Sequence, residues 1–92
     1  MSGAHTPSIT VLYFAAAYTA TGLQTEQVEV PAAGLPLSSL SDELSRRHPN
    51  SGLSDVLATS QWSVNAAMVD DPDSVVLKGG EEVAVICPVS GG

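Results

Sequence analysis

The sequence predicts an α+β fold in which one main helix crosses a mixed β-sheet. Segments of alternating or β-branched residues lie near both ends of the sequence, and an amphipathic stripe with helical spacing lies between them. Turn-forming residues separate these segments. A chain of 92 residues that is 43% hydrophobic can form one core and one domain. We therefore expect a disordered lead at residues 1–7, a folded domain at 8–87 and an extended, flexible tail at 88–92.

Two strands are predicted before the helix. The first spans Ser8–Phe14, and its faces carry Ile9, Val11 and Tyr13 on one side and Thr10, Leu12 and Phe14 on the other. Because both faces contain apolar residues, we expect a central strand, or one whose outer face meets a partner. Thr25–Val30 alternates and predicts a half-buried strand that forms a hairpin with the first. Between them, the Ala-rich segment Ala15–Thr21 predicts a short helical turn before Gly22.

A stripe of leucines predicts the main helix. Leu37, Leu40 and Leu44 follow the i, i+3, i+7 spacing of one helix face, and Pro49 requires the helix to end at or before His48. We expect its first turn to be capped by a serine, either Ser38 or Ser39. Two i, i+4 ion pairs are expected near its end, Asp42–Arg46 and Glu43–Arg47.

The second half of the sequence predicts short elements. Leu53, Val56 and Leu57 fit one further helical turn. Strands are predicted at Ser63–Val69, Ser74–Leu77 and Glu82–Cys87, and the first two are separated by the turn-forming sequence DDPDS. A first hairpin, a crossing helix and a final strand match the ubiquitin-like β-grasp roll.

The charge balance excludes several classes of partner. Ten carboxylates against three Lys and Arg residues give a net charge of −7, which argues against nucleic acid and anionic membranes. The charge suits a basic protein partner, or it serves solubility alone. No apolar run approaches the ~20 residues that span a bilayer, and Met1–Pro7 does not resemble a secretory signal. With a single cysteine as well, we expect a cytosolic protein.

Few side chains in the sequence can support chemistry. His5, His48 and Cys87 are scattered, so we expect no bound metal. Cys87 is interpreted as a small buried residue in the last strand rather than as a nucleophile. The acidic residues at 70–73 flank a proline and predict a solvated turn, and Gly79-Gly80 lacks the context of a phosphate loop. A self-contained enzyme is therefore not expected.

The final five residues offer a different kind of reactive group. A tail from Pro88 to Gly92 can reach roughly 15 Å at ~3.3 Å per residue. Because glycine has no Cβ, Gly91 and Gly92 can enter a narrow channel in another protein. The reactive group would be the α-carboxylate of Gly92, which is ionised at neutral pH and must be activated by a partner.

Several stretches resemble the small subunits of molybdopterin synthase. These are VLYFAAAYTATG at 11–22, the helix ending in His-Pro at 37–49, Asn65 after an apolar strand, and LKGGEEVAVICPVSGG at 77–92. The sequence departs from the family at three places. Cys87 stands where the family usually has the first of two prolines, Tyr18-Thr19 replaces a frequent Arg-Glu, and Gly79-Gly80-Glu81 replaces the usual Asp-Gly-Asp.

The resemblance implies a sulfur-carrier cycle. An enzyme resembling ubiquitin E1 would use ATP to adenylate Gly92, and a sulfur donor would convert it to a thiocarboxylate. The tail would then enter the large subunit of molybdopterin synthase and donate sulfur to cyclic pyranopterin monophosphate, forming the molybdopterin dithiolene. Gly91 would keep the approach narrow, and Pro88, Val89 and Ser90 would set the arm. No cofactor would bind directly, catalytic side chains would belong to the partners, and two small subunits would join a large-subunit dimer.

The resemblance also implies docking through an apolar sheet surface. The matching positions are Phe14, Met68 and Ile86, and the alternative is that all three belong to the core. On the predicted strands, Phe14 lies opposite Tyr13 and Ile86 opposite Val85, which favours an exposed patch.

Other functions remain open for such a sequence. The same carrier chemistry serves thiamin thiazole synthesis, or tRNA thiolation with protein tagging. A ubiquitin-like interaction domain with an inert tail belongs to another class, and a stand-alone enzyme comes third.

Overall fold

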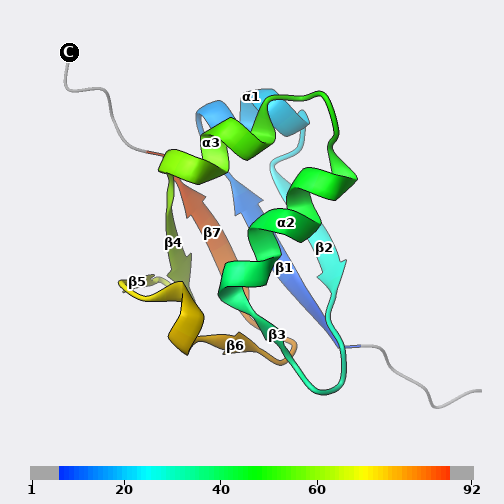
Figure 1. Ribbon diagram of the computed structural model, residues 1–92, viewed down its shortest axis with the longest axis vertical. Helices are drawn as coiled ribbons and strands as arrows, with labels where there is room; N and C mark the ends of the chain where they lie inside the picture. Colours follow the sequence, from blue (N-terminus) through cyan, green and yellow to red (C-terminus); the bar gives the residue numbers. More distant parts are fainter. Residues whose placement is uncertain (1–6, 88–92) are drawn as a thin grey trace, which may run out of the picture.

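The computed structural model of the protein describes residues 7–87. A five-stranded sheet, in the order β2-β1-β7-β4-β5, carries helices on one face, and a two-stranded sheet pairs β3 with β6 (Figure 1). The elements are β1 (Ser8–Tyr13), α1 (Ala16–Thr21), β2 (Thr25–Glu29), β3 (Leu35–Pro36), α2 (Leu37–Arg47), α3 (Leu53–Thr59), β4 (Gln61–Val64), β5 (Ala67–Val69), a 3₁₀ helix (Pro72–Ser74), β6 (Val76–Leu77) and β7 (Glu82–Ile86). This arrangement confirms the predicted α+β class.

The middle of the large sheet is a parallel pair formed by β1 and β7. β2 pairs antiparallel with β1, as the predicted hairpin requires, and β4 pairs antiparallel with β7. β1 is therefore a central strand, which explains why both of its faces carry apolar residues. Its inner face, formed by Ile9, Val11 and Tyr13, is buried in the core.

The predicted leucine stripe is confirmed on α2. Leu37, Leu40 and Leu44 are fully buried, and the helix ends where the amide of His48 donates to the carbonyl oxygen of Leu44 at 3.1 Å. At the other end, the prediction that a serine caps the helix is wrong, because Pro36 occupies the N-cap position and no side chain caps the helix. Instead, the amide of Leu37 donates to the carbonyl oxygen of Val75 at 2.8 Å. Because β3 pairs with β6, this hydrogen bond can form, and α2 begins at Leu37, one residue before Ser38.

Both arginines of α2 converge on one acidic residue. Arg47 Nε donates to Glu43 Oε2 at 3.0 Å, as predicted. Arg46 also pairs with Glu43, three residues before it, so the predicted Asp42–Arg46 pair is wrong. Arg47 further approaches Glu26 on β2, with 3.6 Å between Nη1 and Oε2. The last turn of α2 is therefore tied to the sheet as well as to its own helix.

The predicted strand at 63–69 is two strands with a tight turn between them. β4 and β5 form a hairpin in which Asn65 and Ala66 both have positive φ, 51° and 70°. Two consecutive residues with positive φ form a two-residue hairpin turn whose twist matches that of the flanking strands. Asn65 is also bound to β7, because its amide donates to the Glu82 carbonyl at 2.8 Å and its Oδ1 accepts from the Glu82 amide at 3.0 Å. The apolar pattern at 63–69 predicted one continuous strand and did not indicate this turn.

A polar cluster joins the first hairpin to the end of α2. Tyr13 Oη donates to Glu26 Oε1 at 2.7 Å, and His48 Nε2 lies 2.9 Å from the same oxygen. Burial by itself raises the pKa of Glu26, but the hydrogen bonds from His48 and Tyr13 outweigh it and lower that pKa below its ordinary value. Burial, and then the bond to Glu26, raise the pKa of Tyr13. Glu26 is thus a charged acceptor at the contact between β1, β2 and α2.

We predict that this cluster makes the fold sensitive to acid. Because the pKa of Glu26 in the folded state lies below its ordinary value of 4.5, the carboxylate stabilises the fold above that pH. This contribution is lost as the pH falls through the lower, folded-state pKa. Glu26→Gln should reduce the free energy of unfolding at pH 7 by about 1–3 kcal/mol. It should also weaken the decline of stability below pH 4.5, as measured by urea unfolding at several pH values.

Glu29→Gln is the matched control, because Glu29 is exposed at the end of the same strand. It should leave stability at pH 7 nearly unchanged. An acid profile of Glu26→Gln that matches the unsubstituted protein would show that Glu26 does not carry the effect.

A second prediction concerns the β4–β5 turn. Ala66 adopts a left-handed backbone conformation, which is unfavourable for a residue with a Cβ but not for glycine. Ala66→Gly should raise the free energy of unfolding by about 0.5–1 kcal/mol, because the relief of strain exceeds the entropy that glycine loses. Thermal unfolding would measure this gain. Ala67→Gly, one residue later in β5, should destabilise the protein, and a loss of stability in both variants would refute the explanation.

Candidate functional site

The face of the sheet opposite the helices carries one row of residues across all five strands, in which the small residues Ser63 and Ala84 are only 7% exposed. The strand registers align one row of residues across all five strands, and this row consists of Thr25, Leu12, Ala84, Ser63 and Met68. The adjacent row, which includes Tyr13, Val85 and Trp62, is buried on the helix side. Because successive residues alternate between faces, the first row belongs to the outer face. Helices α2 and α3 lie over the other side (Figure 1).

Two of the three residues expected to bind a partner are strongly exposed on this outer face. Phe14 is 51% exposed and Met68 is 54% exposed, so the alternative that they belong to the core is wrong for both. Ile86 is partly exposed. Phe14 and Ile86 each come one residue after a paired residue, Tyr13 and Val85, so they lie at the same corner of the sheet. Met68 lies on the edge strand β5. We name Leu12, Phe14, Met68 and Ile86 the outer patch.

Cys87 lies at the same corner as Phe14. It follows the end of β7 and is partly exposed, so its interpretation as a buried strand residue is wrong. Its thiol donates to the carbonyl oxygen of Phe14 at 3.4 Å, and Ser60 Oγ lies 3.8 Å from its Sγ. Strand pairing ends one residue earlier, at Ile86, and the partly buried Cys87 side chain packs against the edge of the core. The expected tail, Pro88, Val89, Ser90, Gly91 and Gly92, lies outside the described residues.

Among residues 7–87, the polar side chains considered as candidates for chemistry bond mainly to other residues of the domain. His48 pairs with Glu26, whereas Cys87 contacts Phe14 and Ser60, so the structure does not bring these two candidate residues together. The acidic turn also bonds to itself, because Asp71 Oδ1 accepts from the amide of Asp73 at 3.1 Å. Within this part of the chain, no three His, Cys, Asp or Glu residues are grouped to hold a metal ion.

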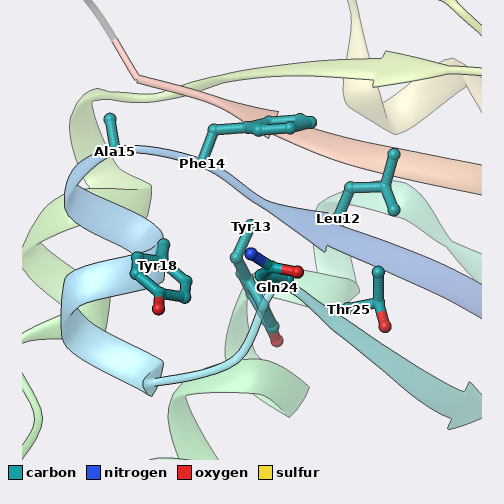
Figure 2. Close-up of a pocket in the computed structure, with 7 residues that line it drawn as sticks. All are labelled: Leu12, Tyr13, Phe14, Ala15, Tyr18, Gln24 and Thr25. Carbon is teal, nitrogen blue, oxygen red and sulfur yellow. The ribbon is translucent and has the colours of Figure 1, made fainter.

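A pocket of about 530 Å³ adjoins the outer patch (Figure 2). Leu12 and Phe14 of the patch form part of its wall, and Tyr18, Gln24 and Thr25 complete it from α1 and the start of β2. The sequence identified Tyr18 only as a departure from a family pattern, and it did not indicate a pocket. The sequence signal was only an aromatic residue within the short Ala-rich segment at 15–21. The pocket forms where α1 packs beside the end of β1 and the start of β2, and the spacing of apolar residues in the sequence does not predict that position.

No helix among residues 7–87 is long and apolar enough to cross a membrane. The longest of them, α2, has 11 residues.

Curated relatives match nearly the whole chain. A molybdopterin synthase sulfur carrier subunit from Mycosarcoma maydis is 40% identical over 89 residues, covering 95% of this chain and 96% of the relative. The human protein of the same description is 40% identical over 85 residues, covering 91% and 93%.

Solved structures share the fold. A putative molybdopterin converting factor subunit 1 from Pyrococcus furiosus has a TM-score of 0.75 at 26% identity, covering 90% of this chain and 99% of that one. SAMP1 from Haloferax volcanii has a TM-score of 0.73 at 26% identity, covering 92% and 99%. A chain from a complex of subunits 1 and 2 of the molybdopterin-converting factor of Helicobacter pylori has a TM-score of 0.63 at 19% identity, covering 92% and 99%.

These neighbours confirm the ubiquitin-like β-grasp fold that the order of elements predicted. The sequence model of the ThiS family matches residues 11–92, which include the second half of β1, the polar cluster, the outer patch and the tail. The chain therefore belongs to the ThiS family, together with the molybdopterin synthase sulfur carrier subunits that it resembles along most of its length.

Proposed function

We propose that this chain is the sulfur carrier subunit of a molybdopterin synthase, and that the carboxylate of Gly92 carries the sulfur. The observation that carries the proposal is the 40% identity, over nearly the full length of both chains, to proteins of that description. The geometry supports it, because the residue before the tail, Cys87, lies beside Phe14 of the outer patch. A partner docked on this patch would hold the tail next to its own active site.

The chemistry of this cycle belongs to the terminus and to the partners. A free carboxylate is ionised and a poor electrophile at neutral pH. An E1-like activating enzyme therefore uses ATP to form an acyl adenylate at Gly92, and a sulfur donor displaces AMP to give a thiocarboxylate. In the large subunit this sulfur passes to cyclic pyranopterin monophosphate, and two transfers build the dithiolene. The side chains of residues 7–87 provide the fold and the docking surface.

Partner binding follows from the outer patch and the net charge. Exposed aromatic and Met side chains are the types enriched at protein interfaces, and Phe14 and Met68 are both exposed here. The net charge of −7 suits a large subunit with a basic surface near its active site. We place the assembly in the cytosol, with two carriers on a large-subunit dimer.

One observation favours a second candidate function. SAMP1 of Haloferax volcanii, a small archaeal modifier protein, shares the fold at a TM-score of 0.73. Protein tagging or tRNA thiolation would use the same activated Gly92, but its acyl group or sulfur would go to another acceptor. Thiamin thiazole synthesis is a third acceptor of the same kind. An interaction domain with an inert tail would need no activation, and removal of the last two glycines would leave its function intact.

We predict that sulfur transfer can be reconstituted from purified components. The chain is prepared with a thiocarboxylate at Gly92 and mixed with a molybdopterin synthase large subunit and cyclic pyranopterin monophosphate. Dithiolene formation is then assayed. Product should require the thiocarboxylate and should vanish when Gly92 is deleted, because the new terminal carboxylate, on Gly91, would end one residue, or ~3.3 Å, short of the acceptor.

The deletion variant should retain its thermal unfolding midpoint, since residue 92 lies beyond the last strand. A large subunit that is active with its own carrier serves as the positive control. If this large subunit forms no product with the thiocarboxylated chain, the acceptor is not the pyranopterin.

We further predict that the outer patch binds the large subunit. Phe14→Asp places a charge on the exposed apolar surface and should weaken binding at least about tenfold, because it removes a central aromatic contact. Isothermal titration calorimetry with the intact chain measures the dissociation constant. Val76→Asp is the control, because Val76 is 43% exposed but belongs to the two-stranded sheet. Equal weakening in both variants would show that the patch is not the binding surface.

A further inference from the structure

The pocket beside the outer patch has properties of an anchor site for a partner side chain. Its walls combine the rings of Phe14 and Tyr18 with Leu12, and Gln24 and Thr25 add polar groups to the lining (Figure 2). Its volume of about 530 Å³ falls within the ~300–1,000 Å³ that is typical of ligand sites. The pocket therefore has room for at least one large side chain.

The pocket walls carry no charged residue among those that the structure describes, although 14% of the chain is charged. An anionic small molecule, such as a phosphate-bearing pterin, would find no cation there. An aliphatic or aromatic side chain would bury its surface against the rings, and a polar atom at its end could bond to Gln24 or Thr25. The lining therefore favours a neutral, largely apolar occupant.

The junction between β1 and α1 is strained at the pocket wall. Ala15 has φ 51° and ψ −123°, a conformation that is unfavourable for any residue with a Cβ. Such strain costs about 1–3 kcal/mol and tends to persist at functional sites, where the surroundings hold it. Here the Phe14 carbonyl oxygen accepts from the amides of Ala17 at 3.0 Å and Tyr18 at 3.4 Å. The strained turn thus holds Phe14 and Tyr18 on opposite sides of one pocket.

The same carbonyl connects the pocket to the start of the tail. Phe14 O also accepts from the thiol of Cys87, the last described residue before the tail. The pocket is therefore continuous with the outer patch through Leu12 and Phe14, and it is joined to the segment that must reach the partner's active site. An occupant of the pocket would belong to the protein that receives the tail.

We propose that this pocket receives an apolar anchor side chain of the molybdopterin synthase large subunit, and that the ring of Tyr18 forms one of the contacts with it. The inference rests on the proposed function and identifies a contact within it. The large subunit is chosen because a related fold occurs in a complex of subunits 1 and 2. It is also the partner that must hold the tail while sulfur is transferred.

The test places a charge in the pocket without altering the tail. Tyr18→Arg puts a cation into an uncharged wall and should raise the dissociation constant for the cognate large subunit at least tenfold. Tyr18→Phe keeps the ring and should bind within about twofold of the unsubstituted chain. Thr19→Arg adds the same charge at the neighbouring exposed position of α1 and controls for net charge. Calorimetry with the full chain and the large subunit gives the dissociation constants.

A second measurement separates docking from chemistry. With thiocarboxylated chains, Tyr18→Arg should need a higher concentration for half-maximal dithiolene formation but should reach the same maximal rate. Unchanged binding by Tyr18→Arg, or equal weakening by Thr19→Arg, would overturn the inference. So would a Tyr18→Arg defect confined to thiocarboxylation by the activating enzyme, because that enzyme would then be the occupant. If the unsubstituted chain itself gives no product, the proposed function fails instead.

Discussion

Hydrogen bonding between β1 and β7, which run parallel in the centre of the sheet, brings the two ends of the domain together. These strands are separated by most of the sequence, so their pairing fixes the path of everything between them. The helices must cross over one face to return the chain, and β2 and β4 must add to the outer edges of the pair. The pairing also leaves Phe14, at the end of β1, beside Cys87, at the end of β7. The position of Cys87 beside the outer patch is therefore a consequence of one strand pair.

The two faces of the sheet have opposite tasks. The inner face buries Val11, Val83 and Val85 against the leucines of α2, and this burial supplies most of the stability. The Glu26 cluster adds a specific polar contact where α2 ends on the first hairpin. The outer face instead leaves Phe14 and Met68 about half exposed to water. A high negative charge around such a face helps to keep the free protein from self-association.

Under the proposed function, residues 7–87 would serve as a recognition body and the carboxylate of Gly92 as the reactive group. A carrier of the proposed kind would be recognised by an activating enzyme and by an acceptor, and both would act on the same carboxylate. A firm sheet surface lets each partner bind the body while it handles the tail. The strained conformation of Ala15 fits this role, because it holds Phe14 outward at a cost in stability that the surrounding hydrogen bonds sustain.

Local pattern determined much of this protein from its sequence. The leucine spacing at 37–44 placed α2, the alternation at 25–30 placed β2, and the motifs near both ends indicated the family. Contacts between distant segments decided the rest. The β4–β5 turn depends on the bonds between Asn65 and Glu82, the start of α2 on Val75, and the position of Cys87 on where pairing with β4 ends. The pocket at Tyr18 likewise arises where α1 folds against β1 and β2. Periodicity records which residues share a face, but the tertiary structure decides which faces meet.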